Sequence, residues 1–194
     1  MSYTSVSEVK AYLGISGTTD DALIASLIDA AHKTIDSYTG RRFEALADGT
    51  HYFTVGEDTD CSTLYLDDDL CQITSIITNA DASSTTTLAT TDYVTQPRNT
   101  TPYYAIRLLA SKGQEWTYED DPETGITVTG RWAWSIVPPD DIKQACTRLA
   151  GYYYRQKDAG VYDTTAIPDA GIIQVPQGIP RDVQLILAPY VRNN

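Results

Sequence analysis

The stretch DDALIASLIDAAHKTIDSYTGRRF, residues 20–43, decides the fold of the N-terminal part, because its apolar residues recur at helical intervals. At about 100° per residue, one group of side chains falls within an arc of roughly 140°. That group consists of Leu23, Ile24, Leu27, Ile28, Ala31, Ile35 and Tyr38. Gly40 is a typical C-terminal stop for such a helix. The stretch therefore predicts one long amphipathic helix with one buried face, and it contains no evident catalytic group.

The residues around this helix predict its start and its surroundings. Before it, SVSEVKAYLGI (residues 5–15) predicts a short helix, with Ser5 and Glu8 at capping-box spacing. Thr18 and Asp21 form a second capping-box pattern at the start of the long helix. Beyond its end, the pair at 41–42 is Arg-Arg, which either complements the negative end of the helix dipole or contacts a partner.

From residue 50 the apolar period changes from that of a helix to two, in segments rich in Thr, Ile, Val and Tyr. About six short strands are predicted, in the segments HYFTV, TLYL, ITSIIT, TDYVTQ, YYAIRLL and GITVTGRW. In the clearest one, Ile126 and Val128 alternate with threonines, which is typical of a half-buried antiparallel strand. Polar segments such as NADASSTTTLATT and QPRNTTP are predicted to be loops or hairpin tips.

Helical spacing returns in VPPDDIKQACTRLAGYYYRQKDAG, residues 137–160. Ile142, Ala145, Cys146, Leu149 and Tyr153 fall on one stripe of this helix, whereas Tyr154 projects from a different side and is predicted to be available to a partner. The final segment, IPRDVQLILAPYVRNN, predicts a short helix that enters through Pro180 and is disturbed or ended by Pro189.

Together these patterns predict a single α+β domain over residues 1–194. The N- and C-terminal amphipathic helices would pack as a helical hub, with a β-rich antiparallel insertion between them. The expected parts are N-terminal helices in 1–43, the β-rich part in 50–134, a helix in 139–157, an extended arm in 158–178 and a C-terminal helix in 179–192.

The charge and the cysteines exclude several kinds of site. The net charge is -12, and residues 41–138 hold six basic and fifteen acidic groups, so this part is not expected to grip nucleic acid phosphates. Three cysteines at wide spacings favour neither a disulfide framework nor a zinc site. No stretch approaches the ~20 apolar residues that span a bilayer, and the N-terminus lacks secretory features, so synthesis in a cytoplasm and no membrane partner are expected.

The inventory for catalysis is thin. His32 and His51 lie in segments of different type, and no P-loop, Rossmann, HExxH or GxSxG motif is present. The acidic runs GEDTDC and LDDDL do not follow the EF-hand pattern and are interpreted as solvated loop carboxylates, with a cation site as the weaker alternative. No catalytic, cofactor or metal residue is therefore nominated. The 14 tyrosines are more suggestive, because tyrosine suits surfaces that another protein buries.

The order of these elements resembles the tailed-bacteriophage head-tail connector (adaptor, head-completion) family over nearly the whole chain. The series that carries the resemblance is VSEVKAYLGI, the long helix ending in YTGRR, ITSIIT, TTDYVTQ, GRWAWSIVPPDDIKQACTRLAGYYYRQ and IPRDVQLILAPYVR. The longer β-rich middle and the segment 158–178 depart from the family pattern, so the resemblance leaves open which surface faces the portal and which the tail.

This resemblance implies a non-enzymatic virion protein at the head-tail junction, made in the cytoplasm of the bacterial host. It would form a ring, usually of a dozen copies, either alone or from monomers that assemble on the portal protein. The ring would extend the DNA channel, let genomic double-stranded DNA pass without specific binding, and offer a face to a tail-completion or stopper protein. No cofactor is implied.

Two sets of residues are the candidates for these contacts. Tyr152 and Tyr154 are predicted to lie at the subunit interface. The candidates for portal docking are Pro180, Arg181, Val183, Leu185, Ile186, Leu187, Tyr190 and Arg192, since C-terminal segments of similar proteins reach toward the portal. The alternatives are another neck or tail-completion protein, a small β-rich module that binds carbohydrate or a cation, and, third, an enzyme that uses His32 or His51.

Overall fold

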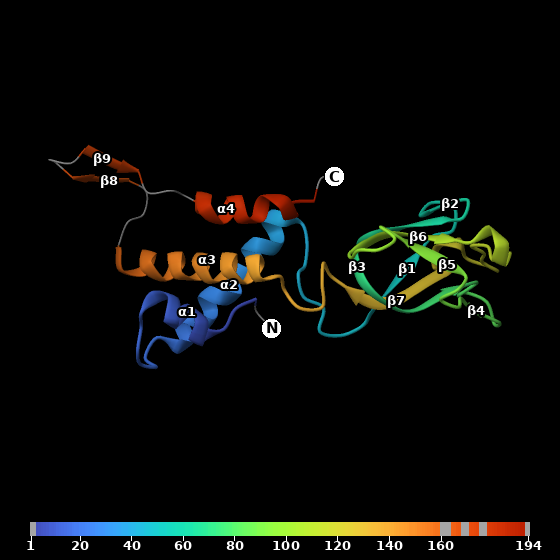
Figure 1. Cartoon of the computed structure of the whole chain (residues 1–194), viewed down its shortest axis with the longest axis horizontal. Coiled ribbons are helices and arrows are strands. Elements are labelled where there is room, and N and C mark those ends of the chain that lie inside the picture. The colour runs from blue at the N-terminus through green and yellow to red at the C-terminus, as the bar shows by residue number, and fades with distance from the viewer. Residues whose placement is uncertain (1–2, 160–163, 168–170, 175–177, 193–194) are drawn as a thin grey trace. The chain divides into compact units, whose positions relative to one another are not determined.

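The computed structural model describes residues 3–159, 164–167, 171–174 and 178–192, with side chains for 3–157 and 178–192. Within this part the fold is mixed α+β, with four α-helices and a seven-stranded antiparallel sheet (Figure 1). The chain divides into two compact units, a helical unit of residues 1–41 and 138–194 and a β unit of residues 42–137. The change from helical to alternating periodicity near residue 50 anticipates this division.

The helical unit contains helices from both ends of the chain. They are α1 (Val6–Leu13), α2 (Asp21–Thr39), α3 (Asp140–Ala159) and α4 (Arg181–Leu187), and the 3-10 helix η3 (Ala188–Tyr190) follows α4 directly. α3 packs against α1, α2 and α4. The α-helical part of the last segment ends before Pro189, as predicted, because proline cannot donate the hydrogen bond that would continue the helix.

The segment predicted as an extended arm, 158–178, includes the end of α3 and two short strands. β8 (Thr164–Ile167) and β9 (Gly171–Gln174) pair as an antiparallel two-stranded sheet. Residues 160–163, 168–170 and 175–177 of this segment lie outside the described residues.

The start of α1 confirms the first capping box, whereas the second is wrong. The backbone N–H of Glu8 donates to Ser5 Oγ at 3.3 Å, and the Ser5 N–H donates to Glu8 Oε2 at 2.7 Å. The Ser5 hydroxyl, which donates to Glu8 Oε2 at 2.8 Å, and the Ser5 N–H together lower the pKa of Glu8. At α2 the N-cap is Asp20, which makes no side-chain capping bond. Asp21 is instead drawn to the ammonium of Lys10, at 2.7 Å, so its carboxylate is not available for the predicted box.

The apolar face of α2 is buried where it meets α3. Ile24, Ile28, Ala31 and Ile35 are at most 1% exposed, and they share a core with the α3 residues Ile142, Ala145, Cys146 and Leu149. Two residues predicted on the buried face, Leu23 and Tyr38, are 36% and 39% exposed. Both lie in the terminal turns of α2, and burial is concentrated in the turns between them.

The β unit is built on one sheet with the strand order β1-β7-β3-β6-β5. Its strands are β1 (Gly49–Phe53), β2 (Thr59–Asp60), β3 (Thr63–Thr78), β4 (Thr86–Thr87), β5 (Tyr93–Gln96), β6 (Tyr103–Leu108) and β7 (Ile126–Trp132). The short strands β2 and β4 pair with β3 at either end of it. Two 3-10 helices, η1 (Ala110–Lys112) and η2 (Pro122–Thr124), lie between β6 and β7.

β3 corrects two predictions at once. The segments TLYL and ITSIIT, expected as separate strands, are the two halves of this one strand, and the register with its neighbours shifts between them. The acidic run LDDDL therefore lies within a strand and not in a loop, and Asp69 is only 5% exposed. Partners distant in sequence make this possible, since His51 Nδ1 lies 2.9 Å from Asp67 and Arg42 Nη2 lies 2.7 Å from Asp68.

β7 confirms the alternating pattern, with Ile126 and Val128 fully buried and the intervening threonines partly exposed. Its Gly130 lies so close to β3 that a Cβ built there would be 2.1 Å from the Gln72 carbonyl oxygen. Only glycine allows the two strands to approach this closely. The core on the inner face contains Phe53, Leu64, Leu66, Leu70, Ile76, Leu88, Ile106, Leu108, Trp116, Ile126, Val128 and Trp132.

Candidate assembly surfaces

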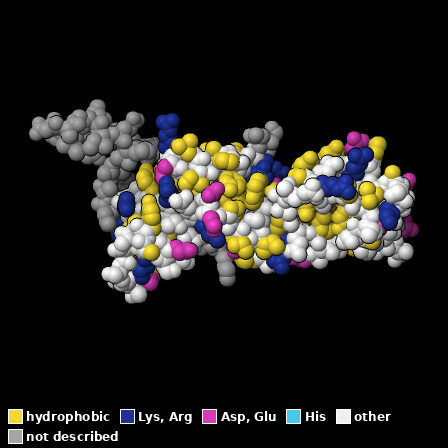
Figure 2. Space-filling model, viewed as in Figure 1, with side chains coloured by type: hydrophobic (Ala, Val, Ile, Leu, Met, Phe, Trp, Pro, Cys, Tyr) yellow, Lys and Arg dark blue, Asp and Glu magenta, His cyan; other side chains and the backbone are white. Residues whose placement is uncertain are grey.

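Large apolar side chains are exposed on both units (Figure 2). On the helical unit they are Tyr12, Leu23, Tyr38 and Leu185. On the β unit they are Leu46, Tyr52, Tyr65, Tyr104, Tyr118, Ile136 and Val137. Such residues, rimmed by charge, are typical of surfaces that another protein covers.

The residues predicted to dock on the portal divide between the core and the surface of α4. Val183 and Leu187 are 1% and 0% exposed, so in this structure they hold α4 in the helical unit. Leu185 is 68% exposed, and Arg181, four residues before it, is also exposed on the same face. The surface that α4 offers to a partner therefore includes Arg181 and Leu185. Asp182 is also exposed but pairs with Arg148, and Ile186 is partly buried.

The end of the C-terminal segment is fastened to the end of α2. Arg41 Nε donates to the Tyr190 carbonyl at 2.8 Å, and the Arg192 N–H donates to the Thr39 carbonyl at 2.8 Å. Thus both members of the arginine pair at 41–42 make internal contacts, Arg41 here and Arg42 with Asp68 in the β unit. The Tyr190 hydroxyl donates to the Asp141 carboxylate at 3.4 Å. The pKa of Tyr190 is raised, mainly by burial of the ring and secondly by the negative charge of Asp141. These contacts fix the chain just after the C-terminal end of α4.

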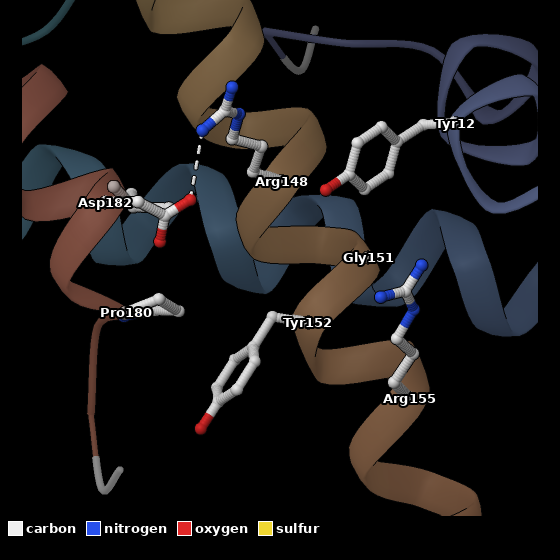
Figure 3. A pocket seen from close by; sticks show the side chains of 8 residues that line it. Tyr12, Arg148, Gly151, Tyr152, Arg155, Pro180 and Asp182 are labelled. Carbon is white, nitrogen blue, oxygen red and sulfur yellow. Dashed lines mark hydrogen bonds and ion pairs between the residues drawn. The ribbon is translucent and has the colours of Figure 1, made fainter.

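A small pocket lies where α3 meets α1 and the start of α4 (Figure 3). Its lining residues are Tyr12, Arg148, Gly151, Tyr152, Arg155, Pro180, Asp182 and Val183. It brings together Tyr152, predicted for subunit contact, with Pro180 and Val183, predicted for portal docking. Arg148 Nη1 pairs with Asp182 Oδ2 at 3.0 Å across one side of it. The pocket has a volume of about 130 Å³.

Tyr152 and Tyr154, both predicted at the subunit interface, point to different surroundings. Two residues along a helix differ by about 200° in direction, and only Tyr152 lines the pocket. The Tyr154 hydroxyl donates to Asp20 Oδ2 at 2.5 Å, and Lys157 Nζ lies 4.4 Å from the centre of its ring. The hydrogen bond from Tyr154 lowers the pKa of Asp20 and raises that of Tyr154. The hydroxyl of Tyr154 thus links α3 to the residue that precedes α2.

Five residues that line the pocket were not predicted as site residues from the sequence, and three of them, Tyr12, Arg148 and Arg155, contribute large side chains. A signal for two of them was present, since Arg148, Gly151, Tyr152 and Arg155 recur at i, i+3, i+4 and i+7 on one face of α3. The contribution of Tyr12 depends on Gly151, because a Cβ at that position would lie 3.0 Å from the Tyr12 ring. The tertiary packing of α1 on α3 is not readable from local patterns.

Titratable groups elsewhere offer little for catalysis. Burial raises the pKa of the Cys146 thiol to about 12, which keeps it protonated and unreactive. His51 stacks on Trp132 at 3.7 Å between ring centres, whereas His32 belongs to the other unit and lies 3.4 Å from Asp36. Across the described residues, no three His, Cys, Asp or Glu side chains are grouped to hold a metal ion. Nor does any described helix combine the length and apolar character needed to cross a membrane.

Comparison with known proteins gives one family and a consistent set of structures. A family model described as "Head completion protein" matches residues 2–193. No curated protein matches the chain. Among solved structures, it is similar to a chain in the neck of an empty gene transfer agent particle computed with C6 symmetry (TM-score 0.59, 17% identity, covering 97% of this chain and 89% of that one).

A second similar structure is a chain in the neck of a native particle computed with C12 symmetry (TM-score 0.57, 17% identity, 97% and 88% covered). A third belongs to the virion of the native gene transfer agent particle (TM-score 0.55, 18% identity, 97% and 89% covered). At these identities the likeness shows a shared fold.

Proposed function

The chain belongs to the head completion protein family, and on that premise we propose that it forms a ring beneath the portal, extends the DNA channel and docks the tail. Membership confirms the resemblance drawn from the order of its elements. It supports a structural, non-enzymatic role in completing the head of the virion, and the fold shared with chains of virion necks supports a place in the neck. The observation that carries the proposal is the match over residues 2–193.

Symmetry supports a ring. The similar chains come from necks computed with C6 and C12 symmetry, and a closed ring of identical subunits needs two different surfaces on each copy. The helical unit would form the hub of this ring, because helices from both ends of the chain pack there around one apolar core. The partners proposed are further copies of this chain, the portal protein, and a tail-completion or stopper protein.

The face of α4 with Arg181 and Leu185 is the proposed portal contact. Its C-terminal end is fastened to the end of α2 by hydrogen bonds, and Asp182 in its first turn pairs with Arg148 of α3, so little conformational freedom would be lost on docking. An exposed leucine beside an arginine provides one apolar anchor and one charge for specificity.

The net charge suits passage of DNA without retention. With -12 overall and most of the excess in residues 41–138, the ring would repel the phosphate backbone wherever these carboxylates reach the channel. The protein would be made in the bacterial cytoplasm and reside at the head-tail junction of the virion.

The proposal can be tested with DNA-filled heads that lack this protein, by measuring whether they become able to bind tails. Adding the purified chain should make such heads bind the tail, and a pull-down should show binding to the portal ring. Binding to an isolated tail ring but not to the portal would instead assign the chain to another position in the neck.

A further inference from the structure

Arg155 stands out in the pocket of the helical unit because it has no ion-pair partner among the described residues. Arg148, two helical turns earlier on the same face of α3, is already paired with Asp182. The Arg155 side chain is exposed and lines the same pocket (Figure 3). A guanidinium on an aromatic-lined pocket is a strong recognition group for a carboxylate.

The volume of the pocket limits the size of the group that it can bind. Its volume of about 130 Å³ is well below the ~300–1,000 Å³ of sites that hold drug-sized molecules or cofactors. It is lined by two tyrosines, a glycine, a proline and a valine as well as two arginines and one aspartate. Because Asp182 is paired with Arg148, the charge of Arg155 leaves the pocket with a net positive charge. It therefore suits a single side chain that carries a negative charge, presented by another protein surface.

The β unit presents negatively charged side chains on a loop whose backbone conformation is fixed by hydrogen bonds. Glu119, Asp120 and Asp121 are consecutive and exposed, and no described residue forms an ion pair with them. Their three backbone N–H groups all donate to the carboxylate of Asp81, at 3.0, 2.6 and 2.8 Å to Oδ2. These bonds lower the pKa of Asp81 against the opposing effect of desolvation. Because the loop is organised in advance, binding would cost little conformational entropy.

We propose that the pocket of one copy receives the Glu119–Asp121 loop of the next copy, with Arg155 paired to a carboxylate of that loop. This contact rests on the proposed ring. It supplies the two different surfaces that a closed ring requires, one on the helical unit and one on the β unit. Charge complementarity favours it, since residues 41–138 carry the excess of acidic groups whereas Arg155 is an uncompensated cation.

The experiment is a charge exchange measured by mass photometry of ring assembly, alone and on the cognate portal ring. Arg155→Glu and Asp120→Arg should each weaken assembly at least tenfold. The double variant should recover to within about threefold of the wild type. Lys33→Glu, which reverses a charge on an exposed side chain outside the pocket, is the matched control and should assemble normally. Raising the salt concentration should weaken the wild type and narrow these differences.

The outcomes separate this contact from the ring itself. A wild type that forms no ring, even on the portal, would overturn the proposed function. Rings formed equally well by Arg155→Glu, or a double variant no better than its singles, would overturn only the pocket contact. Circular dichroism at 222 nm checks that each variant is folded, and Arg155→Gln replaces the reversal if that variant is not.

Discussion

Replacing Gly130 with alanine should unfold the β unit at a much lower temperature. The new Cβ would lie 2.1 Å from the Gln72 carbonyl oxygen and 3.0 Å from Leu70 Cδ1. Since Cβ atoms essentially never come closer than 3.0 Å to such an atom, β7 and β3 must separate by at least 0.9 Å (3.0 less 2.1). A shift of that size stretches the neighbouring ladder bonds beyond good geometry.

The expected loss follows from these two effects. Overpacking costs about 1–3 kcal/mol, and each weakened ladder bond about 1 kcal/mol more, so we expect a destabilisation of about 3 kcal/mol. For a unit of this size, that lowers the melting temperature by about 12–24 °C.

The chain itself provides a selective assay. All three tryptophans, at 116, 132 and 134, lie in the β unit, so their fluorescence follows its unfolding alone. Circular dichroism at 222 nm follows mainly the helices. Gly151→Ala in α3 is the matched control. Its Cβ would lie 3.0 Å from the ring of Tyr12, but that ring is half exposed and can move by a few tenths of an ångström, whereas the Gln72 carbonyl belongs to the backbone of β3. Alanine also gains about 1 kcal/mol of helix propensity. A Gly130→Ala protein that melts within a few degrees of wild type would refute the close approach of β3 and β7.

Three further changes test the surfaces and their supports. Leu185→Asp should weaken binding to the portal ring at least tenfold in surface plasmon resonance with no change in melting temperature; unchanged binding would remove α4 from the docking surface. Tyr154→Phe removes the hydrogen bond that lowers the pKa of Asp20 below its ordinary 3.8. That bond stabilises the fold above pH 3.8 and is lost as the pH falls through the folded pKa, so the gap in stability between wild type and variant, followed by circular dichroism, should shrink on acidification. Asp81→Ala should speed amide hydrogen exchange at residues 119–121, and unchanged protection would contradict the role given to its carboxylate.

Local patterns predicted the helices well because their information is local. The apolar period of α2, the Ser5 capping box and the alternation in β7 all concern residues within a few positions of one another. The continuity of β3 was missed because three consecutive aspartates are typical of a loop. They lie in a strand only because His51 and Arg42, remote in sequence, pair with two of them.

In the candidate surfaces, too, some features follow from local sequence patterns and others depend on residues remote in sequence. The spacing of Val183 and Leu187 against Leu185 already implies that the first two share one face of α4 and the third lies opposite, as the structure has it. Neither the bond from Tyr154 to Asp20 nor the meeting of α1, α3 and α4 around Arg155 follows from any local pattern. Those contacts depend on how the helices pack.

Assembly of this protein as a ring beneath the portal can be tested by imaging. Negative-stain imaging of the purified chain, alone and mixed with the cognate portal ring, tests it most directly. We predict a closed ring of subunits, formed either in solution or only when the portal is present, and stacked on the portal. A chain that stays monomeric and unbound in both samples would contradict it.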